Sequence, residues 1–223
     1  MKTSQHNITE KMLINKNSKI VYNYHPKTKD ELKDIINQKI ESEGNECNLN
    51  DIDTSNILDM SYLFLESDFN GDISNWNVSN VTNMEGMFYS SKFNGDISKW
   101  DVSSVKNTWS MFSYSKFNGD ISNWDVSSVK NMGDMFAISI FTGDISKWNV
   151  SNVESMEDMF TMSEFNGDIS KWDVSNVTNM RSMFSYSKFN SDISNWNVSN
   201  VTNNTDMFYS CPIEEKYKPK FNN

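Results

Sequence analysis

A 24-residue repeat restricts what this chain can fold into more than any other feature. The segment FNGDISNWNVSNVTNMEGMF occupies residues 69–88. Nearly identical segments begin again at Phe93, Phe117, Phe141, Phe165 and Phe189. The tryptophans of these units follow one another every 24 residues, without a single insertion. A fixed period of this length is typical of a solenoid, in which each unit buries its apolar residues only against its neighbours.

A diverged copy of the repeat precedes these units. The segment LNDIDTSNILDMSYLF, residues 49–64, fits the same frame, with Ile52 standing one period before Trp76. Terminal units of a solenoid are atypical because one of their sides lacks a neighbouring unit. We therefore predict about seven coils between residues 45 and 211.

Each unit contains two periodicities of apolar residues. Trp76 and Val78 alternate with a polar residue, as in a short strand with one buried face. The apolar residues from Val81 to Phe88 recur at steps of three and four, as on one face of a helical turn. We predict an α/β solenoid with one parallel sheet, formed by residues near 73–78 of each coil, and with short helical turns on the other face. A parallel β-helix, with strands in place of those turns, is the alternative.

The chain before the repeats carries the signals of a helical cap. Tyr22 and Tyr24 continue an alternation that starts at Ile20, as in a strand, and Thr28 with Glu31 forms a capping box. The helix that follows has an apolar face of Leu32, Ile35, Ile36 and Ile40, and Gly44 is placed to end it. We expect this segment to cover the edge of the first coil, which would otherwise expose unpaired backbone groups. A small docking module is the alternative.

These signals divide the chain into four parts. We predict a disordered N-terminus at 1–17, a strand-helix cap at 18–44, the repeat solenoid at 45–211, and a C-terminal cap or tail at 212–223.

Composition excludes several classes of function. The formal net charge of −10 argues against nucleic acid as a partner, because nucleic-acid binders cluster Lys and Arg. No apolar run is long enough for a transmembrane segment, and Met12, Leu13 and Ile14 are too short a run for the core of a signal peptide. Cys47 and Cys211 stand at opposite ends of the repeats, so we expect no disulfide between them. We predict a monomer without cofactor or metal, and no catalytic residue.

The repeat sequence resembles that of a known protein family. The spacing Ile73-x-x-Trp76-x-Val78 resembles the L-x-x-L-x-L core of leucine-rich repeats. The unit DISxWxVSxV(T/K)NMxxMF is similar to the repeats of the BspA-like leucine-rich repeat proteins of bacterial surfaces, over about three quarters of the chain. The resemblance implies a leucine-rich-repeat-like solenoid and a non-catalytic protein-interaction or adhesion function, with a protein or cell-surface ligand. Because no secretion signal is predicted, an intracellular scaffold or regulator in the cytoplasm is the alternative, and an enzyme ranks third.

The same resemblance implies where a partner would bind. Leucine-rich repeat proteins commonly bind on the concave face, which is lined by the outward positions of the sheet. In this chain the charged residues at those positions are Lys99, Asp101, Asp125, Lys147, Lys171 and Asp173. A rival apolar patch on the opposite side consists of Trp109, Ala137, Ile138, Ile140 and Met162. We favour the Lys/Asp face.

A ladder of six aspartates, spaced 24 residues apart from Asp72 to Asp192, poses an electrostatic problem. Like charges stacked about 5 Å apart repel one another, so each carboxylate needs a compensating partner. Backbone N–H groups of the Asn-Gly-Asp turn are one candidate, and a cation such as calcium is the other. We favour the hydrogen bonds, because one Asp per coil supplies too few oxygen ligands for calcium.

Overall fold

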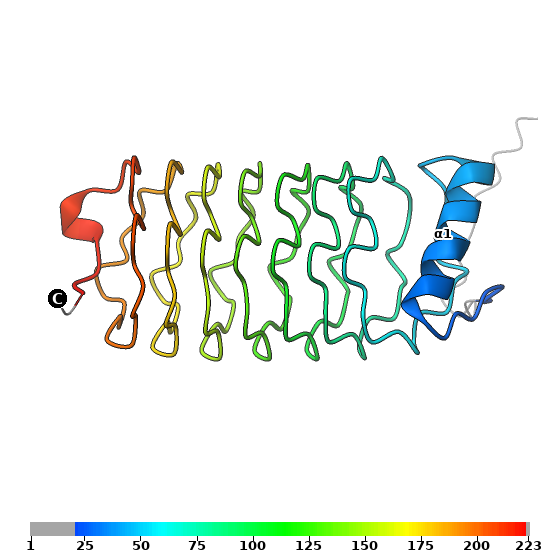
Figure 1. Ribbon diagram of the computed structural model, residues 1–223, viewed down its shortest axis with the longest axis horizontal. Helices are drawn as coiled ribbons and strands as arrows, with labels where there is room; N and C mark the ends of the chain where they lie inside the picture. The colour runs from blue at the N-terminus through cyan, green and yellow to red at the C-terminus, as the bar shows by residue number, and fades with distance from the viewer. Residues whose placement is uncertain (1–20, 222–223) are drawn as a thin grey trace, which may run out of the picture.

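The protein is a stack of similar coils with a helix across one end (Figure 1). The computed structural model describes residues 21–221, so the predicted disordered segment 1–17 and Ile20 lie outside the described residues. Helix α1 spans Lys29–Glu43 at the N-terminal end of the stack, and the 3-10 helix η1 spans Glu215–Tyr217 at the other end. Neither helix of the described chain has the length and apolar composition that crossing a membrane requires.

The parallel sheet predicted near residues 73–78 of each coil is absent from the described residues. The Ile73 carbonyl accepts hydrogen bonds from the Trp76 backbone N–H at 3.1 Å and from the Trp100 indole N–H at 3.2 Å. This carbonyl, which a parallel strand ladder would need as an acceptor, is therefore already bonded within a tight turn and to a side chain. Between residues 21 and 221, parallel pairing occurs only as isolated bridges, such as Asn83 with Asn107. The prediction of a solenoid with one parallel sheet is wrong.

The short helical turns predicted at residues 84–88 are also wrong. Gly86 and Ser90 have φ angles of 56° and 54°, which no right-handed helix can contain. The backbone N–H groups alternate in direction, since Phe88 donates to the Met111 carbonyl of the next coil at 2.9 Å and Met87 donates back to Met84 at 3.2 Å. The spacing of three and four residues between apolar side chains thus comes from consecutive tight turns. Because these segments contain no strands either, the β-helix alternative fails as well.

Aromatic ladders fill the core and confirm the tandem repeat. The Phe88 ring stacks on Phe64 and on Phe112 of the neighbouring coils, with ring centroids 5.5 and 5.6 Å apart. A second ladder runs beside it, in which Phe93 stacks on Phe69 at 6.1 Å. Burial of each ring contributes roughly 1.5–3 kcal/mol, so every inner coil is stabilised by both neighbours.

Helix α1 closes the N-terminal end of the stack (Figure 1). The Thr28 side chain accepts from the Glu31 backbone N–H at 3.2 Å, and Glu31 accepts from the Lys27 backbone N–H at 2.7 Å. Leu32 and Ile36 are completely buried against the first coil. At the far end the described residues form no comparable helix, and no residue of η1 is fully buried. Cys47 and Cys211 are both free thiols.

Candidate interaction surfaces

The aspartate ladder is held by hydrogen bonds from within each coil. Asp96 accepts from the Ser98 hydroxyl at 2.7 Å and from the Ser98 backbone N–H at 2.9 Å. These two bonds hold the pKa of Asp96 below its ordinary value. The donors lie two residues after the aspartate instead of in the Asn-Gly-Asp turn itself. Among residues 21–221 no cluster of three or more His, Cys, Asp or Glu side chains could hold a metal ion.

All six residues of the predicted Lys/Asp face are exposed: Lys99, Asp101, Asp125, Lys147, Lys171 and Asp173. The structure brings two of them together, because Lys147 and Lys171 line a pocket of about 370 Å³ with Ser146 and Asp168. The aspartates of the face accept from the backbone N–H two residues on, as Asp101 does from Ser103 at 3.1 Å. This face is polar and offers no large apolar side chain to a partner.

A second surface carries large aromatic side chains. We call Tyr62, Leu65, Tyr89, Trp109 and Tyr114 the aromatic cluster. Together with Ser110, Ser113 and Asp134, they line a pocket of about 420 Å³. The cluster comes from the tight turns of three successive coils, whose alternate residues point away from the core. Trp109 is 40% exposed and Tyr114 49% exposed, so the cluster leaves a substantial apolar area in contact with water.

Tyr62 is held in place by two residues of the next coil. Its hydroxyl donates to the Glu85 carboxylate, and this bond is the main reason that the pKa of Tyr62 is raised to about 12. Its ring lies over Gly86, where an added Cβ would come within 2.3 Å of Tyr62 Cε1. Gly86 is therefore needed for the space that the ring occupies, whereas its positive φ is shared by non-glycine residues at the same repeat position, such as Ser110 and Asp134.

Trp109 is held in the same manner. Its indole N–H donates to the Asp134 carboxylate at 2.7 Å, and its ring lies over Gly133, where a Cβ would be 2.9 Å from Trp109 Cδ1. Burial raises the pKa of Asp134. Each of these two aromatic side chains is thus fixed by a carboxylate and a glycine of the coil that follows. Such fixed side chains lose little conformational freedom when a partner covers them.

The rival patch predicted from the sequence is only partly assembled. Ile140 and Met162 are exposed, but Ala137 is buried and Ile138 half-buried. Trp109 instead belongs to the aromatic cluster, whose other four members the sequence reasoning missed. A signal was present: Gly86 and Gly133 stand 24 residues after Tyr62 and Trp109, whereas the other six glycines end α1 or belong to the x-Gly-Asp segment.

Comparison with known families places the chain in one of them. The family model described as "Mycoplasma protein of unknown function, DUF285" matches residues 31–142 and 138–216. The chain belongs to this family. The DUF285 match extends over most of α1 and all of the coils, so the helix and the repeats lie within the same family region. No curated protein and no solved structure matches the chain. The description of the family assigns no function.

Proposed function

We propose that this protein is a non-catalytic protein-binding repeat protein whose contact surface is the aromatic cluster. The observation that carries the proposal is the pair of fixed, partly exposed side chains, Tyr62 and Trp109, beside a pocket. Interfaces draw most of their binding free energy from a few Trp, Tyr and Arg side chains that become buried. Large rigid rings supply this energy at a small entropic cost.

The resemblance to BspA-like proteins supports an adhesion role for this binding. In that interpretation the ligand is a protein or another component of a cell surface. An intracellular scaffold or regulator is the alternative, and it would use the same aromatic cluster. Protease treatment of intact cells separates the two: loss of the native protein supports the surface role, and survival until the cells are lysed supports the intracellular one.

The Lys/Asp face is the second candidate surface. Lys147 and Lys171 form no ion pair with any residue between 21 and 221, although both line the same pocket. Two ammonium groups that line one pocket with the single carboxylate of Asp168 attract an acidic partner, mainly by raising the association rate at low salt. Binding through this face would weaken as the salt concentration rises.

Three variants distinguish the surfaces in one assay. The first combines Trp109→Ser with Tyr114→Ser, the second combines Lys99→Glu, Lys147→Glu and Lys171→Glu, and the third combines Ile138→Ser with Ile140→Ser. Binding of each labelled protein to intact cells and to cell extracts is measured, and thermal unfolding verifies that each variant is folded.

We expect the first variant to lose at least about tenfold in affinity, because two large rings leave the interface. The other two variants should keep most of the binding. A larger loss in the lysine variant would move the site to the Lys/Asp face. A larger loss in the isoleucine variant would move it to Ile138 and Ile140. If all three variants bind as well as the original chain, the proposed surface is wrong.

A further inference from the structure

The coils are joined by a directional set of backbone hydrogen bonds. In the sixth of the seven coils, the N–H groups of Met180, Ser182, Phe184 and Tyr186 donate to carbonyls of the last coil at 2.8–2.9 Å. The acceptors are the carbonyls of Asn203, Thr205, Met207 and Tyr209. Every second N–H of the turn segment is used in this way. Within this turn segment each coil therefore offers donors toward the C-terminal end of the stack and acceptors toward the N-terminal end, whereas other bonds run the opposite way, as from the Thr202 N–H to the Thr178 carbonyl at 2.9 Å.

The last coil has the same donors without their acceptors. The equivalent N–H groups belong to Asn204, Asp206, Phe208 and Ser210, and none of them donates to an atom of residues 21–221. An unpaired row of backbone groups is a template on which another segment of chain can pair. The C-terminal end thus presents four donors in the register that a further coil would use.

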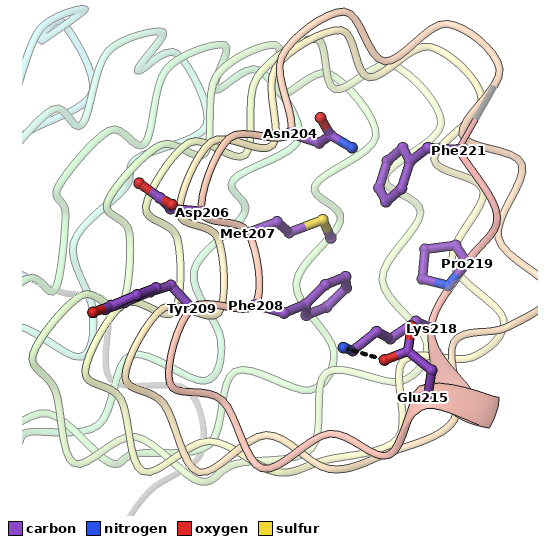
Figure 2. A pocket seen from close by; sticks show the side chains of 9 residues that line it. All are labelled: Asn204, Asp206, Met207, Phe208, Tyr209, Glu215, Lys218, Pro219 and Phe221. Atoms are coloured by element: carbon purple, nitrogen blue, oxygen red, sulfur yellow. Dashed lines mark hydrogen bonds and ion pairs between the residues drawn. The ribbon is translucent and has the colours of Figure 1, made fainter. Parts of the chain in front are cut away.

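An apolar site accompanies these donors. Phe208 stacks on Phe184 at 5.9 Å with nearly parallel rings, but its outer face has no stacking partner within the described chain. That face borders a pocket of about 360 Å³, with Pro219 and Phe221 on the other side (Figure 2). Lys218, paired with Glu215 at 2.6 Å, lies 5.5 Å from the centre of the Phe208 ring. The pocket lies where the next coil would place its phenylalanine.

The C-terminal tail fills only part of this end. Ile213 is buried one period after Phe189, and the Glu214 N–H donates to the Asn190 side chain at 3.1 Å, so the tail begins along the path of a further coil. It leaves that path at η1. The turn segment of the last coil, with its four donors, therefore lacks the cover that inner coils receive.

The chemistry of the end restricts what can bind there. Two copies joined through the turn segments of their C-terminal ends would place these four donors against the same donors, which cannot pair. Head-to-tail stacking of two copies is blocked because α1 covers the N-terminal end (Figure 1). The remaining occupant is a segment that brings carbonyl groups at alternate residues. It also needs one large apolar side chain for the pocket beside Phe208.

We propose that the C-terminal end of the stack is a second binding site, which takes a peptide segment of another protein in the turn conformation of a further coil. The segment pairs its alternate carbonyls with Asn204, Asp206, Phe208 and Ser210 and inserts an aromatic side chain between Phe208 and Phe221. This mode is comparable to strand addition, with tight turns in place of the strand: backbone pairing supplies affinity and a side-chain pocket supplies specificity. The site is separate from the aromatic cluster and does not depend on the function proposed for it.

A peptide taken from the chain itself provides the probe. The peptide NMRSMFSYSKF, residues 179–189, carries the carbonyls of Asn179, Arg181, Met183 and Ser185, which accept from the preceding coil in the folded protein. Its phenylalanine, Phe184, stacks on Phe160 there at 5.7 Å. The matched control is the same peptide with Phe184→Ser. Because only the peptide changes, the fold of the protein is the same in both measurements.

The experiment follows backbone amide signals of the isotope-labelled full chain by NMR during titration with each peptide. We expect the signals of Asn204, Asp206, Phe208 and Ser210 to shift and their hydrogen exchange to slow. The Phe184→Ser peptide should bind at least about tenfold more weakly, because burial of a phenyl ring is lost. The variant Trp109→Ser should bind the probe unchanged, which separates this site from the aromatic cluster.

Three outcomes would overturn the proposal. The first is the absence of any change in the four amides at millimolar peptide, and the second is equal binding of the two peptides. The third concerns the protein without peptide: hydrogen exchange of the four amides becomes slower as the protein concentration rises. That result would show that a second copy of the chain occupies the end.

Discussion

The two ends of the stack are closed in different ways. At the N-terminal end, α1 lays 15 residues across the first coil, and Lys39 joins Glu43 and Asp51 at 3.2 and 3.3 Å. At the C-terminal end, η1 has three residues, none of them fully buried, and only Tyr217 packs against the core. The two ends also differ in the backbone groups that the hydrogen bonds between coils leave without a partner. In the turn segments, the N-terminal end of the described stack presents carbonyls, whereas the C-terminal end presents the N–H groups of Asn204, Asp206, Phe208 and Ser210.

An end of the stack is closed only when its apolar side chains are covered and its backbone groups are paired. Helix α1 buries its own Leu32 and Ile36 against the first coil and needs no backbone pairing with the coils to do so. The C-terminal tail buries Ile213 but leaves four donors of the last coil without acceptors among residues 21–221. We therefore expect stability to be highest in the middle, intermediate at the helical end and lowest at the C-terminal end.

The largest effect should come from the middle of the stack. Trp124 is almost completely buried, and its indole N–H donates to the Ile97 carbonyl at 3.1 Å. Trp124→Ala should lower the free energy of unfolding by about 3–5 kcal/mol, measured by urea denaturation. Trp124→Phe, which keeps much of the ring volume, should cost less. A melting temperature unchanged by the alanine variant would mean that neighbouring coils do not depend on one another.

The sequence predicted the repeat and its core better than the backbone that carries them. Position by position, Ile73, Trp76, Val81 and Phe88 are buried as their periodicity indicates. The assignment of strand and helix failed, because steps of two, three and four also arise from tight turns with left-handed residues. Apolar spacing reports which residues face the core, and it does not report the sign of φ at Gly86 or Ser90.

The candidate site shows the same limit. Exposure of the six Lys/Asp residues could be predicted, since polar residues at fixed positions of a repeat point outward. The aromatic cluster could not, because its members occupy different positions of the repeat and meet only when coils are stacked. Tyr62 and Tyr114, for example, occupy different repeat positions in coils two apart and yet line one pocket. Gly86 and Gly133 were the only sequence signal of this arrangement.

The second largest effect tests the helical end. Ile36 is completely buried between α1 and the first coil, whereas Ile35 on the same helix is only partly buried. Ile36→Ala should cost roughly 2–5 kcal/mol of unfolding free energy, and Ile35→Ala should cost less. Hydrogen exchange should accelerate first in the coil nearest α1. Equal costs for the two variants would show that α1 does not act as a closed cover.

The C-terminal end should tolerate a similar change better. Phe208 has a ring partner on one face only, while Phe184 is stacked between Phe160 and Phe208. Phe184→Ala should cost about 3–5 kcal/mol, and Phe208→Ala roughly half as much, because part of the Phe208 ring already contacts water. Urea denaturation of both variants measures the difference. Equal losses would mean that the tail covers Phe208 as completely as a coil would.

The smallest effect at neutral pH is expected in the aspartate ladder, which runs through middle and ends alike. The folded chain lowers the pKa of Asp96 from its ordinary value of 3.8, so this carboxylate adds stability above that pH and loses its contribution as the pH falls through the folded pKa.

Asn48 holds the equivalent position in the first coil, where its side-chain oxygen accepts from the Asn50 N–H at 2.8 Å. Asp96→Asn should therefore keep the turn, leave stability at pH 7 nearly unchanged, and reduce the loss of stability between about pH 5 and 3. Asp96→Ala, which removes the acceptor, should be less stable than the original chain at pH 7. Urea denaturation of the three proteins from pH 7 to 3 measures both effects, and an Asn variant as acid-sensitive as the original chain would assign the acid response to other carboxylates.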